Sequence, residues 1–266
     1  MLANFYRRLN ILSIDVALGA MSGALFFAKL LQVQVLLYGV VCLGLTVWII
    51  YTVDHLLDAS RIGKEASTAR HRFHQQHFNS LVKGVLIAIL INIVLTFFMR
   101  EQVLLGGAFL SVGVVLYLLI NRYLKILKEL LISVLYTCGI LMPSIAVTNF
   151  SWIEIPWIVV FQFILVAFLN LLVFSWYDWE NDIRDGTTSF ATKLGMKTTR
   201  TCILVLFACV VAGLFFSTLP SASLLLVVMA LLQVLIFFNK KHLLHNDRFR
   251  IAGEAVFILP LFYLLF

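Results

Sequence analysis

The chain has 266 residues, of which 62% are hydrophobic and 12% are charged, and its mean hydropathy is +1.02. A soluble domain is typically about 45 to 50% apolar, so this composition excludes a soluble globular protein and predicts an integral membrane protein. The net charge of +7 comes from basic residues in short loops between apolar segments, where membrane topology explains it, and we expect no nucleic-acid partner.

Nine apolar segments follow one another along the chain, each near the length of about 20 residues that a helix needs to cross a bilayer. They cover residues 11–31, 34–53, 80–99, 102–120, 130–149, 155–177, 199–218, 221–238 and 249–266. Helices are expected because lipid cannot satisfy free backbone groups and no barrel-like alternation is present. We predict an all-α polytopic membrane protein, a single domain over residues 1–266, with nine transmembrane helices in a bundle around a central cavity.

The basic residues predict the orientation of this bundle. Of the 20 lysines and arginines, only Lys29 and Arg100 fall on the side opposite the N-terminus. Because cytoplasmic loops carry an excess of lysine and arginine, we expect the N-terminus and both acid-rich loops to be cytoplasmic and the C-terminus to lie across the membrane. The predicted location is the inner (plasma) membrane of a bacterium.

The first acids of the chain lie in or beside apolar segments. Asp15 falls inside the first segment, and a buried acid usually faces a cavity or a partner, so Asp15 is a candidate for an acceptor pocket. After the second segment, WIIYTVDHLLDASR carries Asp54 and Asp58 four residues apart on one helical face, with Arg61 about a turn further on. Acids at the edge of lipid are costly and tend to be functional.

A histidine-rich loop follows the first acid pair. RHRFHQQHF places His71, His74 and His77 three residues apart, a spacing that can bind zinc. No cysteine or nearby acid completes the ligand set, so a solvated or phosphate-facing loop is the preferred interpretation.

A second and denser acid region ends the sixth segment, where residues 177–195 read YDWENDIRDGTTSFATKLG. On a helix, Asp178, Asp182 and Asp185 can share one face while Glu180 turns to the opposite side. Two carboxylate pairs with basic residues nearby are what a magnesium diphosphate site needs, since Mg²⁺ prefers carboxylate and phosphate oxygens. Loop cations would meet the remaining charge of the diphosphate, and the candidates are Arg61, Lys64, Arg122, Lys125, Lys193 and Lys197.

The spacing of the second acid region resembles a known family motif. The pattern D-x-x-x-D-x-x-x-G-x-x-S-x-A-x-x-x-G is similar to the second aspartate motif of the UbiA superfamily of intramembrane prenyltransferases, and it is read from Asp178, Asp182, Gly186, Ser189, Ala191 and Gly195. The first motif of that family usually reads N-x-x-x-D-x-x-x-D, often with a further Asp directly after the Asn. Asp54 and Asp58 match its spaced aspartates, whereas Ile50 and Tyr51 stand in the places of the Asn and the extra Asp.

The resemblance implies an enzyme that uses Mg²⁺ ions held by Asp54, Asp58, Asp178 and Asp182 to bind a polyprenyl diphosphate. The prenyl group would pass to an aromatic, quinone-precursor-like acceptor or another hydrophobic acceptor within the lipid bilayer. Further substrate-binding candidates are Arg61, Lys64, Arg122, Lys125, Asp185, Lys193, Tyr51, Tyr177 and Asp15.

Three other functions stay open from the sequence. Cyclisation or hydrolysis of a prenyl diphosphate without an acceptor would fit the altered first motif. A transporter would also place acids in a membrane, although transporter sites typically lie near the bilayer midplane and not at one face. A non-catalytic relative that only binds a lipid is the third.

Overall fold

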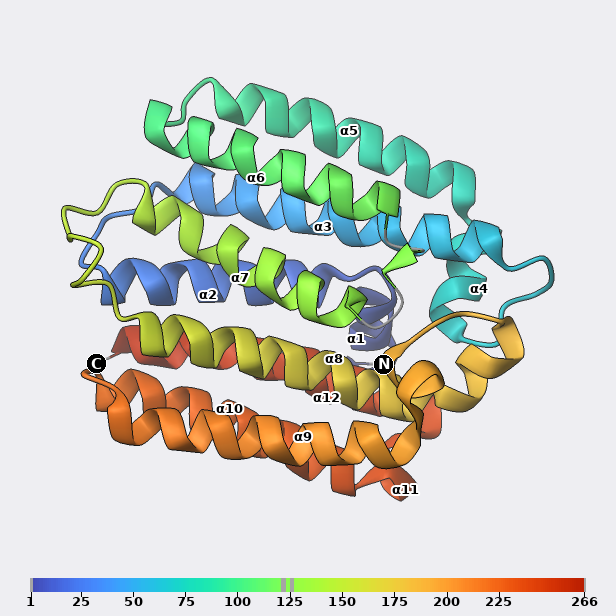
Figure 1. The fold of residues 1–266 in the computed structure, drawn as a ribbon. Coiled ribbons are helices and arrows are strands. Elements are labelled where there is room, and N and C mark those ends of the chain that lie inside the picture. The colour runs from blue at the N-terminus through green and yellow to red at the C-terminus, as the bar shows by residue number, and fades with distance from the viewer. Residues whose placement is uncertain (1, 121–122, 125–126, 266) are drawn as a thin grey trace.

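The computed structural model describes residues 2–120, 123–124 and 127–265, and every regular element in these ranges is a helix (Figure 1). The helices are α1 (Leu2–Ile11), α2 (Ile14–Leu30), α3 (Leu37–Arg61), α4 (Ala69–Gln76), α5 (Phe78–Thr96), α6 (Glu101–Ile120), α7 (Lys128–Ile145), α8 (Trp157–Asp185), α9 (Phe190–Phe216), α10 (Pro220–Phe238), α11 (Lys240–Leu243), η2 (His245–Asp247), α12 (Arg248–Ala255) and η3 (Val256–Leu265). The predicted all-α class is confirmed.

Seven of the helices are long and apolar enough to cross a membrane, namely α3, α5, α6, α7, α8, α9 and α10. The first and last predicted spans are not among these seven helices. The first is α2, with 17 residues, and the last is divided into α12, with 8 residues, and the 3₁₀ helix η3, with 10. Pro260 lies inside η3, where its missing N–H and its ring disfavour a continuous α-helix.

Burial differs sharply between the helices. Val159, Phe163 and Leu169 of α8 are fully buried, and α8 supplies much of the protein core. Tyr117, in contrast, is the one described residue of α6 that is buried. The outward side chains of α6 are apolar, and Phe109 is 84% exposed. This distribution suits a helix whose outer face meets lipid, because lipid tails are as apolar as these side chains.

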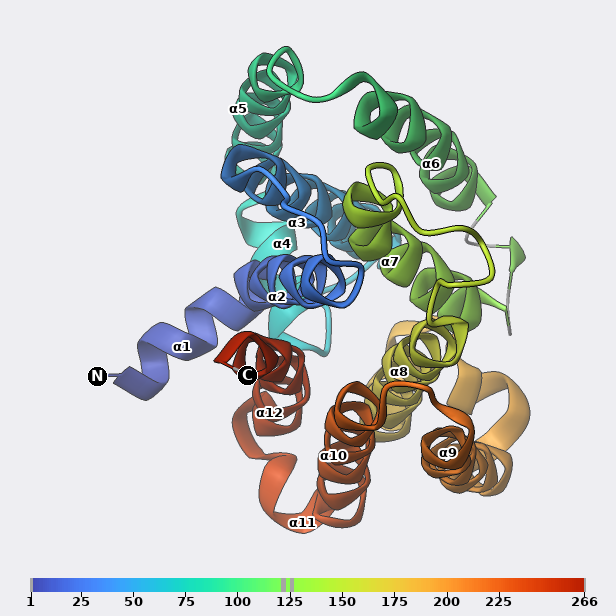
Figure 2. The same cartoon turned by 90° about the vertical axis from the view of Figure 1, so that its left-hand side faces the viewer.

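The helices run up and down, so that distant parts of the chain meet at one end of the bundle. Figure 1 shows the C-terminal ends of α3 and α8 at the same end as α4, on the right of the view. Viewed along the bundle, α2, α7, α8 and α12 surround its middle (Figure 2). Both acid-rich regions therefore lie at one end of the molecule.

Candidate active site

The second acid region is a tight turn between two long helices. α8 continues without a break to Asp185, and Gly186 then takes the left-handed conformation, with φ of 69°, that commonly ends a helix. Ser189 caps α9, and its backbone N–H donates to Thr192 Oγ1 at 2.8 Å. Two positions of the aspartate motif, Gly186 and Ser189, thus end one helix and cap the next.

Ala191 and Gly195 are the last two positions of the aspartate motif, and they let α9 pack closely on α8. Ala191 is fully buried, and its N–H donates to Ser175 Oγ of α8 at 2.8 Å. Gly195 has φ of 80° and ψ of 160°, a region that is essentially restricted to glycine, and it kinks α9. The small residues of the motif therefore hold the start of α9 close against the acid-bearing end of α8.

The three aspartates of α8 contact three different partners. Asp178 is buried and forms an ion pair with Arg250 of α12. Asp182 accepts a hydrogen bond from the Thr187 hydroxyl at 3.0 Å. Asp185 turns to the loop that follows α3, and Glu180, as expected, is exposed on the other side of the helix. The carboxylates thus share an end of the bundle without converging on one point.

The loop after α3 is bound directly to the end of α8. Asp185 accepts from the Ser67 N–H with both oxygens, at 3.1 and 3.0 Å, and from the Ser67 hydroxyl at 2.6 Å. Lys64 Nζ donates to the Arg184 carbonyl at 2.7 Å. These contacts join residues that are 118 and 120 positions apart in the sequence. The two acid regions are therefore neighbours in space.

The first acid pair is held by cations of the protein. Asp58 pairs with Arg61 at 3.2 Å and with Lys128 Nζ of α7 at 3.1 Å. Asp54, one turn earlier on α3, lies within electrostatic range of Lys128. Glu129, next to Lys128, accepts from the Phe190 N–H at 2.6 Å and so joins the start of α7 to the start of α9.

The remaining predicted substrate-binding residues differ in their exposure and in their contacts. Arg61 and Lys193 are exposed, and Arg122 and Lys125 lie outside the described residues. The buried Tyr177 donates its hydroxyl to the Ile236 carbonyl at 2.6 Å and stacks on Phe249, with ring centroids 4.2 Å apart. Tyr177 thus connects α8 to α10 and α12.

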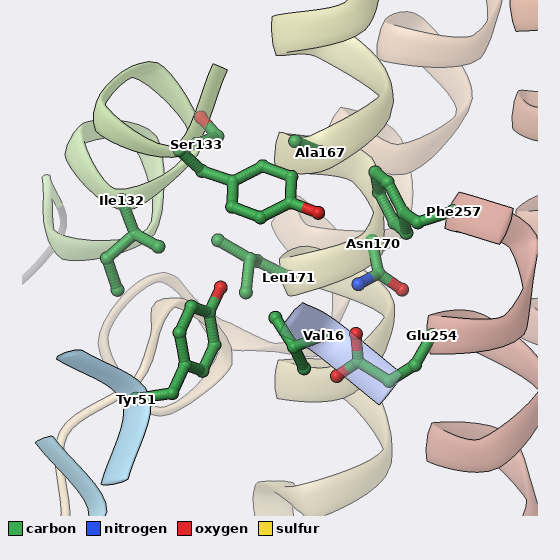
Figure 3. A pocket seen from close by; sticks show the side chains of 10 residues that line it. Val16, Tyr51, Ile132, Ser133, Ala167, Asn170, Leu171, Glu254 and Phe257 are labelled. Carbon is green, nitrogen blue, oxygen red and sulfur yellow. The ribbon is translucent and has the colours of Figure 1, made fainter. Parts of the chain in front are cut away.

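A small cavity lies inside the bundle, between α2, α3, α7, α8, α12 and η3. It is lined by Val16, Tyr51, Ile132, Ser133, Tyr136, Ala167, Asn170, Leu171, Glu254 and Phe257 (Figure 3). Its volume is about 20 Å³, room for roughly one water molecule. Asp15 is buried and accepts from Asn10 Nδ2 at 2.6 Å, and it lies within electrostatic range of Glu254.

Several polar residues of this region were not singled out from the sequence. Glu254 sits in the last apolar segment and carries the same signal as Asp15, an acid inside a predicted span. From the sequence, Arg70 and Arg250 are only two of the basic residues on the side of the N-terminus, yet both contact residues in the interior. Arg70 is buried and donates to the Asn10 carbonyl at 2.9 Å.

The histidines of α4 pack against this polar region. His74 is buried, with Nδ1 2.9 Å from the Arg70 carbonyl oxygen. Burial lowers the pKa of His74, and burial lowers the pKa of His71 to about 4. Both imidazoles are therefore neutral near pH 7. Over the described ranges, no three histidine, cysteine, aspartate or glutamate side chains converge as a ready metal site, zinc included.

The donor chemistry at the acid-rich end fits magnesium. Asp54, Asp58, Asp178 and Asp182 supply carboxylate oxygens, and Mg²⁺ typically takes one or two carboxylates together with phosphate oxygens and waters. Asp58 and Asp178 are each paired with a protein cation, so a metal ion at either carboxylate would share it with that cation or displace the cation.

No protein-family model matches the chain, and no curated protein matches its sequence. Two solved structures are similar in fold. The structure of a UbiA homologue from Archaeoglobus fulgidus bound to DMAPP and Mg²⁺ has a TM-score of 0.64 at 11% identity, and the similarity covers 97% of this chain and 98% of that one. A structure of digeranylgeranylglyceryl phosphate synthase has a TM-score of 0.53 at 17% identity over 99% of this chain and 98% of that one. The chain therefore has the fold of the UbiA superfamily, the family whose second aspartate motif its sequence resembles.

Proposed function

We propose that the protein is a magnesium-dependent integral-membrane prenyltransferase that moves a prenyl group from a polyprenyl diphosphate to an aromatic or other lipid acceptor. The observation that carries this proposal is the junction of the two acid regions on a UbiA fold, made by Ser67 with Asp185 and by Lys64 with Arg184. The structural relative from A. fulgidus is bound to DMAPP, a prenyl diphosphate, and to Mg²⁺, which supports the same substrate class here.

The acids and cations divide the work of binding the diphosphate. Asp54, Asp58, Asp178 and Asp182 would hold Mg²⁺, which when bound neutralises the diphosphate and makes it a better leaving group. Lys64 and Lys128 lie at the same end of the bundle and would meet the remaining negative charge, with Arg61, Arg122, Lys125 and Lys193 as further cations.

The reaction breaks the bond between prenyl C1 and the diphosphate oxygen, and the electron pair leaves with the diphosphate. A nucleophilic atom of the acceptor forms the new bond to C1, and the acceptor releases a proton. The role of the protein is to hold the leaving group at the acid-rich end while the prenyl chain and the acceptor lie among the apolar helices.

We also propose that α2, and α12 with η3, complete a nine-span domain over residues 1–266, with the acid-rich end in the cytoplasm of a bacterium. The distribution of basic residues supports this orientation, since Lys29 and Arg100 alone fall at the other end of the predicted arrangement.

The experiment uses the purified protein with labelled prenyl diphosphates and a panel of acceptors, in Mg²⁺ and in EDTA. We expect Mg²⁺-dependent binding of a prenyl diphosphate and acceptor-dependent release of diphosphate. Asp182→Asn should abolish turnover, whereas Glu180→Gln, on the exposed side of the same helix, should leave it unchanged. A wild-type protein that binds no prenyl diphosphate in Mg²⁺ would refute the proposal.

One observation favours a second reaction on the same fold. Tyr51, which stands where the family has an acid, lines the central cavity with the side chain of Tyr136. Aromatic faces can shelter a carbocation, so cyclisation or hydrolysis of a prenyl diphosphate without an acceptor is the alternative. Mass spectrometry of the products decides between the two, because only the alternative gives a hydrocarbon or an alcohol when no acceptor is present.

A further inference from the structure

Glu254 brings an acidic group to the wall of the central cavity. Of the ten described residues that line the cavity, Glu254 is the one with an acidic side chain, and it is only 6% exposed. Figure 3 shows its carboxylate directed into the cavity from α12, facing Asn170 of α8 and Tyr51 of α3. Burying a carboxylate is costly, so this position calls for a partner.

Two acceptor groups at the cavity, Asn170 Oδ1 and the Glu254 carboxyl group, have no hydrogen-bond donor among the described residues. Asn170 is 5% exposed, and its Oδ1 is buried without a hydrogen-bond partner. Among the described residues, no hydrogen bond or ion pair to the Glu254 carboxylate is formed. A buried acceptor that lacks a donor costs about 1 to 3 kcal/mol. A ligand that brings a hydrogen-bond donor would remove this cost.

The position of Glu254 is determined by close packing of α12 on α8. A Cβ added at Gly253 would lie 2.6 Å from the Phe174 ring and 2.8 Å from Asn170 Oδ1, so only glycine allows this approach. Gln233 Nε2 of α10 donates to the Gly253 carbonyl at 3.0 Å. Glu254 and Asn170 are thus held side by side by the backbone.

None of the described residues that line the cavity is a lysine or an arginine. Asp15 lies within electrostatic range of Glu254 and adds negative charge. Arg70 and Arg250 also interact with Glu254 electrostatically, but neither lines the cavity, and each is bound elsewhere, Arg70 to Asn10 and Arg250 to Asp178. A carboxylate or phosphate placed here would meet acceptor oxygens and like charge.

We propose that Glu254 and Asn170 form a subsite that binds the hydroxyl group of an uncharged acceptor, an alcohol or a phenol, and that disfavours acceptors carrying a carboxylate at this point. This inference rests on the proposed prenyl transfer. Tyr51 and Tyr136 also line the cavity, and a phenolic hydroxyl can donate or accept a hydrogen bond. A volume of about 20 Å³ has room for a hydroxyl group.

The test measures binding of matched ligands to the purified protein: 2-naphthol, 2-methoxynaphthalene and 2-naphthoate, and a long-chain alcohol with its methyl ether and the fatty acid of equal length. In at least one set we expect the hydroxyl compound to bind about ten- to a hundredfold more tightly than its ether or its acid, because neither of those can donate a hydrogen bond to the buried acceptors. Glu254→Gln should reduce that preference and weaken the exclusion of the acid. Glu101→Gln, an exposed acid at the start of α6, is the matched control and should change neither.

Binding of geranyl diphosphate in Mg²⁺ is measured on the same samples and separates the two proposals. If wild type fails to bind the diphosphate, the proposed function is refuted. If it binds the diphosphate but binds the hydroxyl compounds no better than their ethers, the cavity holds only a structural water and the subsite is refuted. The wild-type comparison decides the matter even if Glu254→Gln fails to fold, and a folded Glu254→Gln with an unchanged preference also overturns the proposal.

Discussion

The hydrogen bonds of Asp185 are predicted to hold the loop at residues 62–68 against α8. Asp185→Asn removes the charge and leaves one carbonyl oxygen for the N–H and hydroxyl of Ser67. A hydrogen bond to a charged group contributes roughly 1.5 to 3 kcal/mol, and we use the lower value because Asp185 is partly exposed. The two donors together then contribute about 3 kcal/mol, of which a neutral amide retains about half.

A loss of about 1.5 kcal/mol corresponds to about a tenfold increase in local opening. Hydrogen–deuterium exchange followed by mass spectrometry measures this opening directly. The Ser67 amide should exchange about tenfold faster in Asp185→Asn, while amides in the middle of α8 stay protected. Glu180→Gln changes a carboxylate on the same helix that does not contact the loop, and it is the control. An unchanged exchange rate at Ser67 in the folded variant would refute this reasoning.

Three further predictions concern stability. Gly195→Ala forces a side chain into a glycine-only conformation and should cost about 1 to 3 kcal/mol, seen as a lower thermal midpoint, whereas Gly63→Ala, with open space around it, should not lower it. Arg250→Met leaves the buried Asp178 carboxylate without its ion-pair partner and should lower the free energy of unfolding by about 3 to 5 kcal/mol. Adding Asp178→Asn should restore part of this loss. A double variant that is no more stable than Arg250→Met would contradict the pairing. The pKa of His71 is about 4 in the fold against about 6.5 unfolded, so the unfolded chain takes up the proton first as the pH falls, and stability is lost between about pH 6.5 and 4, by up to about 3 kcal/mol. A thermal midpoint that falls as steeply in His71→Gln as in wild type over that range would contradict this assignment.

Short-range rules account for the helix ends at the site. The left-handed turn at Gly186 and the cap at Ser189 follow from short-range backbone chemistry, and both are present. The exposure of Glu180, opposite the buried Asp178, follows from helical periodicity. Helical periodicity also predicts that Asp178, Asp182 and Asp185 share one face, but a shared face does not decide which neighbour each side chain meets.

The chain by itself determined that the protein is a bundle of apolar helices with acids at two helix ends, since hydropathy and spacing are properties of each segment alone. Only the tertiary structure decided that Lys128 pairs with Asp58, that Arg250 pairs with Asp178, and that Glu254 faces the cavity. Each of these contacts joins helices distant in sequence, and it depends on which helix packs against which and at what rotation. Segment hydropathy carries no information on that choice, because in lipid the association of helices is set by close packing and polar contacts and not by the burial of apolar surface.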